Sequence, residues 1–594
     1  MLNNFSFTSK KGVVLIQAFL FLVLVLACLN NPLISQWSAL PNVYLFFFIS
    51  LLFSVPILIL ELNDSKKRLN LIDLGVVFFF LFLIIHIIWN IGNGNLFLND
   101  SLLSLSFILI MYFPFKYLIK HNYSSVVQVF ILIFDIHLIL GAVQFFYSYL
   151  NGLDISLTVS GSFRHSGIFS IYLASFLPIR FNMAKNKLDS IFSYWNIFLL
   201  SFILLLVLAT QSRAGLFLYC ISLIFLFRTY IKSFYSKSRY KVILLTATII
   251  FSTALITTLI YLKVPSALGR LFIWQNSFEM FWQKPILGWG SGGFEKSYLD
   301  QQATYFKNNL SSDAYKYKMV ADSVSSPLNE YLKILVDHGI MGIFCLAITI
   351  RIIWKFSKNI HNKNEYSFFF TLTLILLSAF VYFTFQSTTI FLVLLLCLAY
   401  ISSGESELNL YVTINKSVTL LIKGLLFILC SLLFYYSLEQ YNATARWKKA
   451  INHMESHPEI SLKVYKEISN ELNHRPAFNY NYGVTLFQYG RYPESVKIFE
   501  DLRNKFVTLD VMLYLGKSYQ AVKQYNNAEK IFKDASFMVP NRFIPKYNLF
   551  RLYHEIKDFK KADAVAQEIL TMPVKISSNE VDSIKNEVKK MLIK

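Results

Sequence analysis

The stretch LIDLGVVFFFLFLIIHIIWN, residues 71–90, indicates how this chain folds. An apolar run of about 20 residues is long enough to cross the roughly 30 Å hydrocarbon core of a bilayer as a helix. Comparable runs recur along the sequence, which is 55% hydrophobic and only 15% charged, with a mean hydropathy of +0.48. A soluble domain carries about 25% charged residues. We therefore expect an all-α, polytopic membrane protein.

These apolar runs predict about 13 transmembrane helices. The first run follows Lys10 and Lys11 and has no small-residue cleavage site, so we expect it to be retained as a first span. The expected spans cover residues 13–30, 42–61, 71–90, 101–118, 125–149, 166–183, 192–210, 213–229, 241–262, 334–354, 366–384, 386–402 and 418–437.

Basic residues predict the orientation of these spans. Lys and Arg gather in every second loop, and the positive-inside rule places such loops in the cytoplasm. This assignment puts the N-terminus in the cytoplasm, and it puts the long loop 263–333 and the C-terminal region on the outer face. The net charge of +21 then reflects membrane topology, and we expect no nucleic-acid partner. The basic loops contain residues 10–11, 66–68, 116–120, 180–187, 228–241 and 351–363.

The cysteines and the short motifs argue against several classes of enzyme. All five cysteines lie inside apolar runs and none forms a CxxC pair, which disfavours a disulfide framework or a metal site. The sequence has no HExxH or GxSxG motif, and GWGSGGF at 288–294 lacks the Lys and Ser/Thr that end a P-loop. We therefore expect no metal, no cofactor and no nucleotide-driven reaction. The cysteines are Cys28, Cys220, Cys345, Cys397 and Cys430.

From about residue 440 the chain becomes polar and repetitive. The segments 489–499, 522–532 and 556–566 align, each with an aromatic residue followed by a small one. Their spacing resembles the period of about 34 residues of tetratricopeptide repeats, in which two helices form each unit. We predict a membrane domain at 1–437 and a helical repeat domain at 438–594. Stacked repeats form a concave surface, so a protein partner is expected there.

Three arginines stand at the predicted outer boundary of the membrane: Arg164, Arg213 and Arg270. The planar guanidinium matches the oxygens of a phosphate, and its charge does not titrate away. A charge beside an apolar run, as in LATQSRAGLFLYC at 208–220, is costly and often functional. Each arginine alone could be an anchor that extends its charge to the interface. Together they predict an anionic site, and its outward position suggests a lipid-linked diphosphate.

The order of five short segments resembles the O-antigen ligase and O-antigen polymerase superfamily of bacterial membrane glycosyltransferases. The family's G-S-F loop corresponds to residues 161–163, and its S-R-A segment corresponds to 212–214. An Arg and a Trp four positions apart follow as Arg270 and Trp274. A P-I-L-G-x-G turn then occupies 285–290, and an N-x-Y-L segment begins at Asn329 and continues to Gly342. The resemblance covers about residues 150–345.

The resemblance implies a GT-C-like fold in the bacterial inner membrane, in contact with membrane lipid. It also implies transfer of an oligosaccharide from undecaprenyl diphosphate to an acceptor hydroxyl on the periplasmic face, with inversion and without metal. The acceptor would be lipid A-core or a protein Ser or Thr. The implied catalytic residues are Arg213 and Arg270, with His165 and Glu330 as further candidates. The implied substrate-binding residues are Arg164, Ser212, Trp274, Gly288, Gly290, Asn329 and Tyr331.

The main departure from the family pattern concerns the general base. Ligases carry a His immediately before the Asn of the N-x-Y-L segment, and this chain has Leu328 there. His165, Glu330 and Asp322 remain candidate bases, whereas His338 lies where the pattern does not ask for His and is expected to be structural or interfacial.

Two other functions remain open. The first is a polymerase of repeat units, which would use the same fold and donor. The second is a catalytically inactive scaffold or a transporter, although a transporter should show paired broken helices or intramembrane charges in corresponding halves. The appended repeat domain favours the transferase, because such a surface can recruit a protein acceptor or an assembly partner.

Overall fold

The computed structural model describes the residues 10–29, 42–61, 66–92, 111–183, 193–237, 264–309, 312–357, 363–404, 410–413, 416–454 and 458–592. These residues are almost entirely helical, as the sequence predicts. Within them, the strands β1 (Lys66–Leu69) and β2 (Leu410–Thr413) form one antiparallel pair. The pair joins the segments that lead into α3 and α18, which lie far apart in the sequence.

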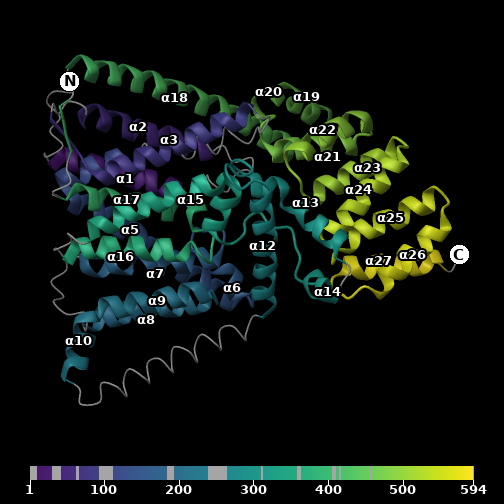
Figure 1. The fold of residues 1–594 in the computed structure, drawn as a ribbon, viewed down its shortest axis with the longest axis horizontal. Helices are drawn as coiled ribbons and strands as arrows, with labels where there is room; N and C mark the ends of the chain where they lie inside the picture. Colours follow the sequence, from purple (N-terminus) through teal and green to yellow (C-terminus); the bar gives the residue numbers. More distant parts are fainter. Residues whose placement is uncertain are drawn as a thin grey trace.

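The membrane part is a stack of helices that lie side by side (Figure 1). Among the described residues, three segments are long and apolar enough to cross a membrane: Tyr112–Leu150, Glu330–Lys355 and Ser417–Asn452. The count of about 13 spans stays a prediction, and the expected span 241–262 lies outside the described residues. The stack contains α1 (Lys10–Leu29), α2 (Asn42–Glu61), α3 (Leu71–Gly92), α5 (Tyr112–Leu150), α7 (Ser166–Met183), α8 (Tyr194–Ala209), α9 (Arg213–Leu226), α10 (Arg228–Lys237), α15 (Glu330–Ser357), α16 (Lys363–Ser378), α17 (Thr388–Ser403) and α18 (Lys416–Asn452).

Helix α5 differs from the sequence-based expectation of two spans at 101–118 and 125–149. The structure has one helical element over Tyr112–Leu150, interrupted at Asn122 by a non-helical backbone (φ −156°, ψ 64°). The Asn122 side chain accepts a hydrogen bond from the Ser125 backbone N–H at 3.4 Å, which caps the second half at its N-terminus, and another from the Ser125 hydroxyl at 2.9 Å. The structure therefore has a kink at Asn122, where the sequence predicts a loop between two spans.

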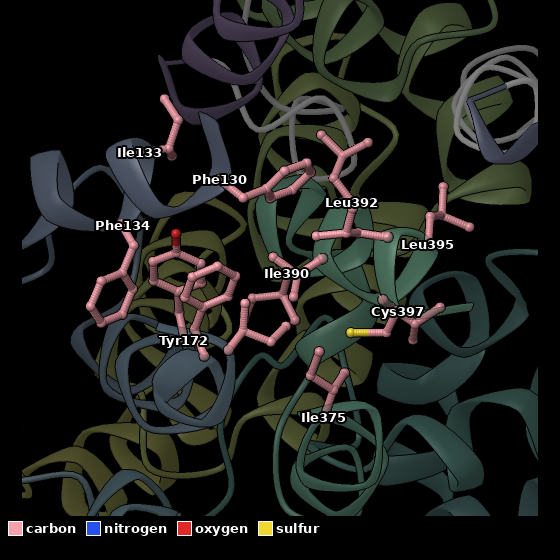
Figure 2. Packing of buried hydrophobic residues seen from close by; sticks show 14 of the residues in the cluster. Phe130, Ile133, Phe134, Tyr172, Ile375, Ile390, Leu392, Leu395 and Cys397 are labelled. Carbon is pink, nitrogen blue, oxygen red and sulfur yellow. The ribbon is translucent and has the colours of Figure 1, made fainter. Parts of the chain in front are cut away.

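The core of the membrane part lies between α5, α7, α16 and α17. Figure 2 shows Phe130 and Phe134 of α5 near Tyr172 of α7 and Ile390 of α17. The Phe134 and Tyr172 rings have centroids 5.8 Å apart, a distance typical of attractive aromatic pairs. Of the four cysteines whose side chains the structure describes, Cys345, Cys397 and Cys430 are buried, Cys220 is half-buried, and all four are free.

Two ion pairs hold charged residues within the stack. Lys116 of α5 pairs with the buried Asp73 of α3, which also accepts a hydrogen bond from the Tyr112 hydroxyl at 2.8 Å. Arg180 of α7 donates from Nε to Asp135 of α5 at 2.9 Å. Each charge has a partner, which offsets the cost of removing it from water.

The described part of the segment between α10 and α15 forms a helical layer across the ends of the stack (Figure 1), which we call the outer layer. It contains α12 (Val264–Gln283), α13 (Gly293–Asn308) and α14 (Ser312–Lys318). The turn after α12 is pinned to α15 by backbone hydrogen bonds from Trp289 to Val336 (2.9 Å) and from Gly290 to Asp337 (2.8 Å). The predicted outer loop is therefore an ordered scaffold where it is described.

The C-terminal helices form successive antiparallel pairs. The aligned aromatic residues Tyr492, Tyr525 and Phe559 each begin the second helix of a pair, and the small residues Ser495, Ala528 and Ala562 are fully buried. The helix α18 runs without a break through the predicted boundary at 437/438. The C-terminal elements are α19 (Pro458–Glu467), α20 (Ser469–Leu472), α21 (Pro476–Gln488), α22 (Tyr492–Lys505), α23 (Leu509–Ala521), α24 (Tyr525–Met538), α25 (Phe543–Glu555), α26 (Phe559–Thr571) and α27 (Asn579–Leu592).

The C-terminal helices and the outer layer share one hydrophobic core. Phe294, Tyr298 and Leu299 of α13 are buried in the same cluster as Met538 and Val539 at the end of α24. The side chain of Gln302 in α13 donates to the carbonyl of Met538. The repeat helices are thus fixed against the layer that carries Arg270.

The amide of Asn541 provides a test of this contact. It donates to the carbonyls of Ala321 (2.6 Å) and Lys318 (2.9 Å), just after α14. Asn541→Ala leaves the buried carbonyl of Ala321 without this donor, which costs about 1–3 kcal/mol. We expect trypsin to cleave faster after the exposed Lys318 in this variant than in the wild type. Asn527→Ala is the control, because its amide contacts only the exposed Gln524 side chain; equal cleavage of both variants would contradict the assigned contact.

Candidate active site

The G-S-F loop is held by two side chains of α5. The Gln144 amide oxygen accepts from the backbone of Ser160 (3.0 Å) and Gly161 (2.7 Å), and its nitrogen donates to the Gly161 carbonyl. His137 pairs with the Ser162 hydroxyl at 2.9 Å. Gly161 has φ +59°, and a Cβ there would lie 2.9 Å from Phe169. This loop positions Arg164 and His165 directly before α7.

The S-R-A segment is a helix start that brings Arg213 to the beginning of α7. The Ser212 hydroxyl caps α9 by accepting from the Gly215 backbone at 3.1 Å. Gly215 lies against Ser170 of α7, since a Cβ would approach the Ser170 hydroxyl to 2.1 Å. Ser212, predicted to bind substrate, therefore has a capping hydrogen bond that places its neighbour Arg213.

Arg270 lies in the cluster with Arg213 and Tyr382. Its Nη1 donates to the Val381 carbonyl at 3.1 Å, while its Nε is buried and has no hydrogen-bond partner. Burial lowers the pKa of Arg270, the nearby Tyr382 opposes this shift, and the charge of Arg213 adds to it. Within the described residues, Arg270 pairs with no carboxylate. The two arginines therefore form a positive site with an unused donor, suited to a bound anion.

The turn between α16 and α17 completes this cluster, and the sequence analysis missed it. Tyr382 and Phe383 stack at 4.8 Å between ring centroids. The Tyr382 hydroxyl packs on Gly167 of α7, where a Cβ would lie 2.3 Å from it. The sequence predicts two spans at 366–384 and 386–402 and gives no signal for a functional turn between them. Only the contacts of Tyr382 with Gly167 and Arg270 reveal it.

His165 approaches the same turn from the G-S-F loop. Its ring meets Phe383 edge to face, with centroids 5.1 Å apart. Burial and the adjacent Arg164 charge both lower the pKa of His165 below its usual 6.5. Burial also lowers the pKa of Arg164. The imidazole is therefore neutral near pH 7 and able to accept a proton.

Glu330, the first residue of α15, is buried and makes hydrogen bonds to the neighbouring turn. Its side chain is buried and accepts from the backbone of Phe385 at 3.0 Å, and its backbone donates to Ala379 at 2.8 Å. Glu330 thus ties α15 to both ends of the turn that carries Tyr382. The contacts of Glu330 hold this turn in place. Its predicted part in catalysis stays a prediction.

Four further predicted residues also make structural contacts. The Asn329 side chain caps α15 by accepting from Leu332 at 3.1 Å. Tyr331 donates to the Leu376 carbonyl at 2.7 Å, and Trp274 donates to the Pro327 carbonyl at 2.8 Å. Gly288 meets the Val336 carbonyl so closely that a Cβ would lie 2.5 Å from it. These residues position α12 and α15; their contact with substrate stays a prediction.

The other candidate bases have different surroundings. Leu328, at the family's His position, has φ +55° in the turn before α15. Asp322 forms ion pairs with Arg542 (3.2 Å) and Lys575 (3.5 Å) of the C-terminal helices. His338 contacts α3, where its Nδ1 lies 3.0 Å from Nδ1 of His86. Of the candidate bases, His165 is the one whose ring meets the turn of Tyr382 and Phe383.

The described residues contain no group of three or more His, Cys, Asp or Glu side chains that could hold a metal ion. The polar groups gathered around Tyr382 are mainly cationic and neutral. This donor set fits an anion better than a cation.

The helical stack and the arginine cluster beside the outer layer define a class: a membrane protein with several apolar helices and a group of arginines near the helix ends. Residues 198–347, which include Arg213, Arg270 and the turn 285–290, match the family model of the O-antigen ligases. This match confirms the resemblance to the O-antigen ligase and polymerase superfamily. None of the curated proteins matches this chain. The G-S-F loop and the C-terminal helices lie outside the matched segment, so the tetratricopeptide assignment stays a prediction.

Proposed function

We propose that this protein transfers an oligosaccharide from a polyprenyl diphosphate, of the undecaprenyl type, to an acceptor hydroxyl on the outer face of the inner membrane. The acceptor class is lipid A-core or protein Ser/Thr. The observation that carries this proposal is the pair Arg213 and Arg270, with a buried guanidinium nitrogen that has no partner. The family match supports a glycosyltransferase-type ligase.

The diphosphate is already a good leaving group, so the protein's task is to position it and stabilise its charge. Arginine donors aimed at the phosphate oxygens stabilise the negative charge that grows as the glycosidic bond breaks. Helix α12, which carries Arg270, also exposes Leu271, Phe278 and Trp282. Such an apolar face suits a helix at a lipid interface, close to where a polyprenyl chain would run.

We assign the base to His165. The neutral imidazole accepts the proton of the acceptor hydroxyl as that oxygen attacks the anomeric carbon and the diphosphate departs. Its approach to the turn of Tyr382 and Phe383 brings it near the arginines. This assignment would account for the Leu at the position where ligases carry a His.

The pH dependence of transfer tests His165. Because burial and the Arg164 charge lower the pKa of His165, the rate should be constant at neutral pH and should fall as the pH drops through that lowered pKa. His165→Gln should lower the rate by roughly a hundredfold, in the range of general-base contributions, and should flatten the acid limb. His121→Gln, on an exposed ring bonded to Tyr117, is the control. An unchanged acid limb in His165→Gln would rule out His165 as the base.

A repeat-unit polymerase is the second candidate, because the same donor site would serve it. The contact between the C-terminal helices and the outer layer supports the transferase, because helices that could recruit an acceptor then lie against the layer that carries Arg270. An inactive scaffold or a transporter would not explain why a buried nitrogen of Arg270 has no hydrogen-bond partner.

Deletion of the gene separates these functions when the cell's glycans are divided by carrier. Long chains that remain on the polyprenyl carrier, with one acceptor class bare, would support the transferase and identify its acceptor. Accumulation of single repeat units on the carrier would support the polymerase. Unchanged pools in a strain without a second such enzyme would overturn both activities.

A further inference from the structure

Helix α18 lies at the edge of the stack, and one of its faces changes from apolar to polar along the helix (Figure 1). Residues three and four positions apart share a helix face, and the spacing continues beyond Tyr435 with Glu439, Asn442 and Arg446, which are exposed. The change marks the level at which the candidate membrane span Ser417–Asn452 leaves the hydrocarbon. The apolar part of this face, which we call the apolar stripe, consists of the exposed residues Leu421, Leu425, Ile428, Leu432 and Tyr435.

A hollow of about 380 Å³ lies on the same face where the apolar stripe ends, and we call it the boundary pocket. Sites for small ligands have volumes of roughly 300–1,000 Å³. The segment that contains α20 packs on α18 and forms the opposite wall of the pocket. The lining includes Tyr435, Leu438, Glu439, Asn442, Arg446 and Glu471. The boundary pocket therefore lies at the height of lipid headgroups.

The carboxylates of the boundary pocket lack a cationic partner among the described residues. Oε2 of Glu471 is buried and accepts no hydrogen bond from that part of the chain, and Glu439 forms no ion pair there. The cation in the described lining is Arg446, which pairs with Glu467 of α19. A buried charged acceptor without a donor is costly. A ligand that brings N–H donors would therefore be stabilised in this pocket.

A primary ammonium group fits these carboxylates. It has three N–H donors, so it can donate to more than one carboxylate at once, and hydrogen bonds between ionised groups are stronger than neutral ones. A trimethylammonium group has the same charge but no N–H, and it would leave Oε2 of Glu471 without a donor. Arg446 has five donors, so its pairing with Glu467 leaves others for a phosphate oxygen beside the ammonium.

The apolar stripe indicates which molecule carries this ammonium. Acyl chains attached to the headgroup would lie along Ile428 and Leu432, which the protein leaves uncovered. Tyr435, at the end of the stripe, is of the residue type that is enriched at the level of lipid headgroups. A free amine or a lysine side chain of another protein would fill the pocket but not the stripe.

We propose that the boundary pocket binds a glycerophospholipid with a primary ammonium headgroup, such as phosphatidylethanolamine. Glu439 and Glu471 hold the ammonium, Arg446 donates to the phosphate, and the acyl chains lie on the apolar stripe. The bound lipid bridges α18 and the segment of α20 where the chain leaves the membrane. This proposal concerns neither the donor nor the acceptor of the transfer reaction and is tested without it.

The test is native mass spectrometry of the full-length protein in detergent, titrated with dioleoyl phosphatidylethanolamine or dioleoyl phosphatidylcholine. The acyl chains are identical, so a difference in apparent Kd comes from the headgroup. The wild type should bind the ethanolamine lipid about tenfold more tightly, as expected for hydrogen bonds to a charged group. Glu471→Gln should abolish this preference by weakening only the ethanolamine lipid. Arg446→Gln should weaken both lipids by a similar factor, because both carry the phosphate.

Glu459→Gln is the matched control, because it removes an exposed carboxylate from α19 outside the pocket and should keep the preference. Each variant must elute as a monodisperse peak. Glu471→Gln preserves side-chain size and the hydrogen bond from Gln440 to the backbone carbonyl of residue 471 (3.1 Å). Should it still fail to fold, Glu439→Gln, at an exposed position, takes its place and should lower the preference severalfold.

Three results would overturn the proposal: equal affinity of the wild type for the two lipids, an unchanged preference in Glu471→Gln, or the same loss of preference in Glu459→Gln. Glycerophosphoethanolamine, which has the headgroup but no acyl chains, should bind far more weakly than the whole lipid. Binding as tight as that of the lipid would mean that the apolar stripe contributes nothing and that the occupant is a soluble amine.

Discussion

Arg270→Ala should lower the rate of glycan transfer by about two to three orders of magnitude, the loss seen when a donor to a transition-state anion is removed. The guanidinium lies beside Arg213 and has one buried nitrogen that is free to bind a phosphate oxygen. Among the described residues it donates to the Val381 carbonyl and pairs with no carboxylate, so the fold in this part does not depend on an ion pair of Arg270. Transfer from a purified polyprenyl-diphosphate donor, followed on a gel, measures the effect.

Two companion variants separate charge from geometry. Arg270→Lys keeps the charge but loses the planar fork, so it should retain an intermediate rate. Arg351→Ala removes an exposed charge from the far part of α15 and should transfer at the wild-type rate. If Arg270→Ala inserts normally and keeps full activity, the diphosphate assignment is wrong.

The residue types of the arginine cluster could be predicted because charge near an apolar run is conspicuous. Tyr382 could not, since FVYFTFQS at 380–387 reads as more membrane-spanning sequence. Its role depends on Gly167, which makes room for the hydroxyl, and on Glu330, which accepts from Phe385. These partners lie far from Tyr382 in the sequence, and no local sequence pattern predicts the contacts.

The same limit applies to the outer layer. The sequence predicts a loop at 263–333 and repeated segments after residue 440, but it gives no sign that the two pack against each other. Tyr298 and Leu299 of α13 are buried against the repeat helices, and Gln302 donates to Met538. Apolar residues on one face predict that a helix packs on something; they do not identify the partner. That information lies in the three-dimensional contact alone.

Gly339→Ala should be the most destabilising single substitution in the membrane part that adds only a methyl group. Gly339 has φ +63° at the kink of α15, and a Cβ would lie 2.2 Å from the carbonyl oxygen of Ile286. With φ +63° and ψ −161°, its backbone lies in a region that is essentially restricted to glycine, which costs an alanine about 1–3 kcal/mol. The clash is with backbone, which cannot rotate away as a side chain can, so overpacking adds about 1–3 kcal/mol.

Gly152→Ala is a control that has a positive φ but no clash. Its φ is +62°, nearly identical to that of Gly339, and no atom lies within 4 Å of an added Cβ. Each variant, purified in detergent and heated, is scored by the fraction that still elutes as a monodisperse peak. Gly152→Ala should lose a few degrees of stability and Gly339→Ala clearly more, because only the latter pushes the turn 285–290 away from α15. Equal losses would mean that the turn 285–290 can move away from α15 at no energetic cost. The contact of this turn with α15 would then not fix the position of α12 and its Arg270.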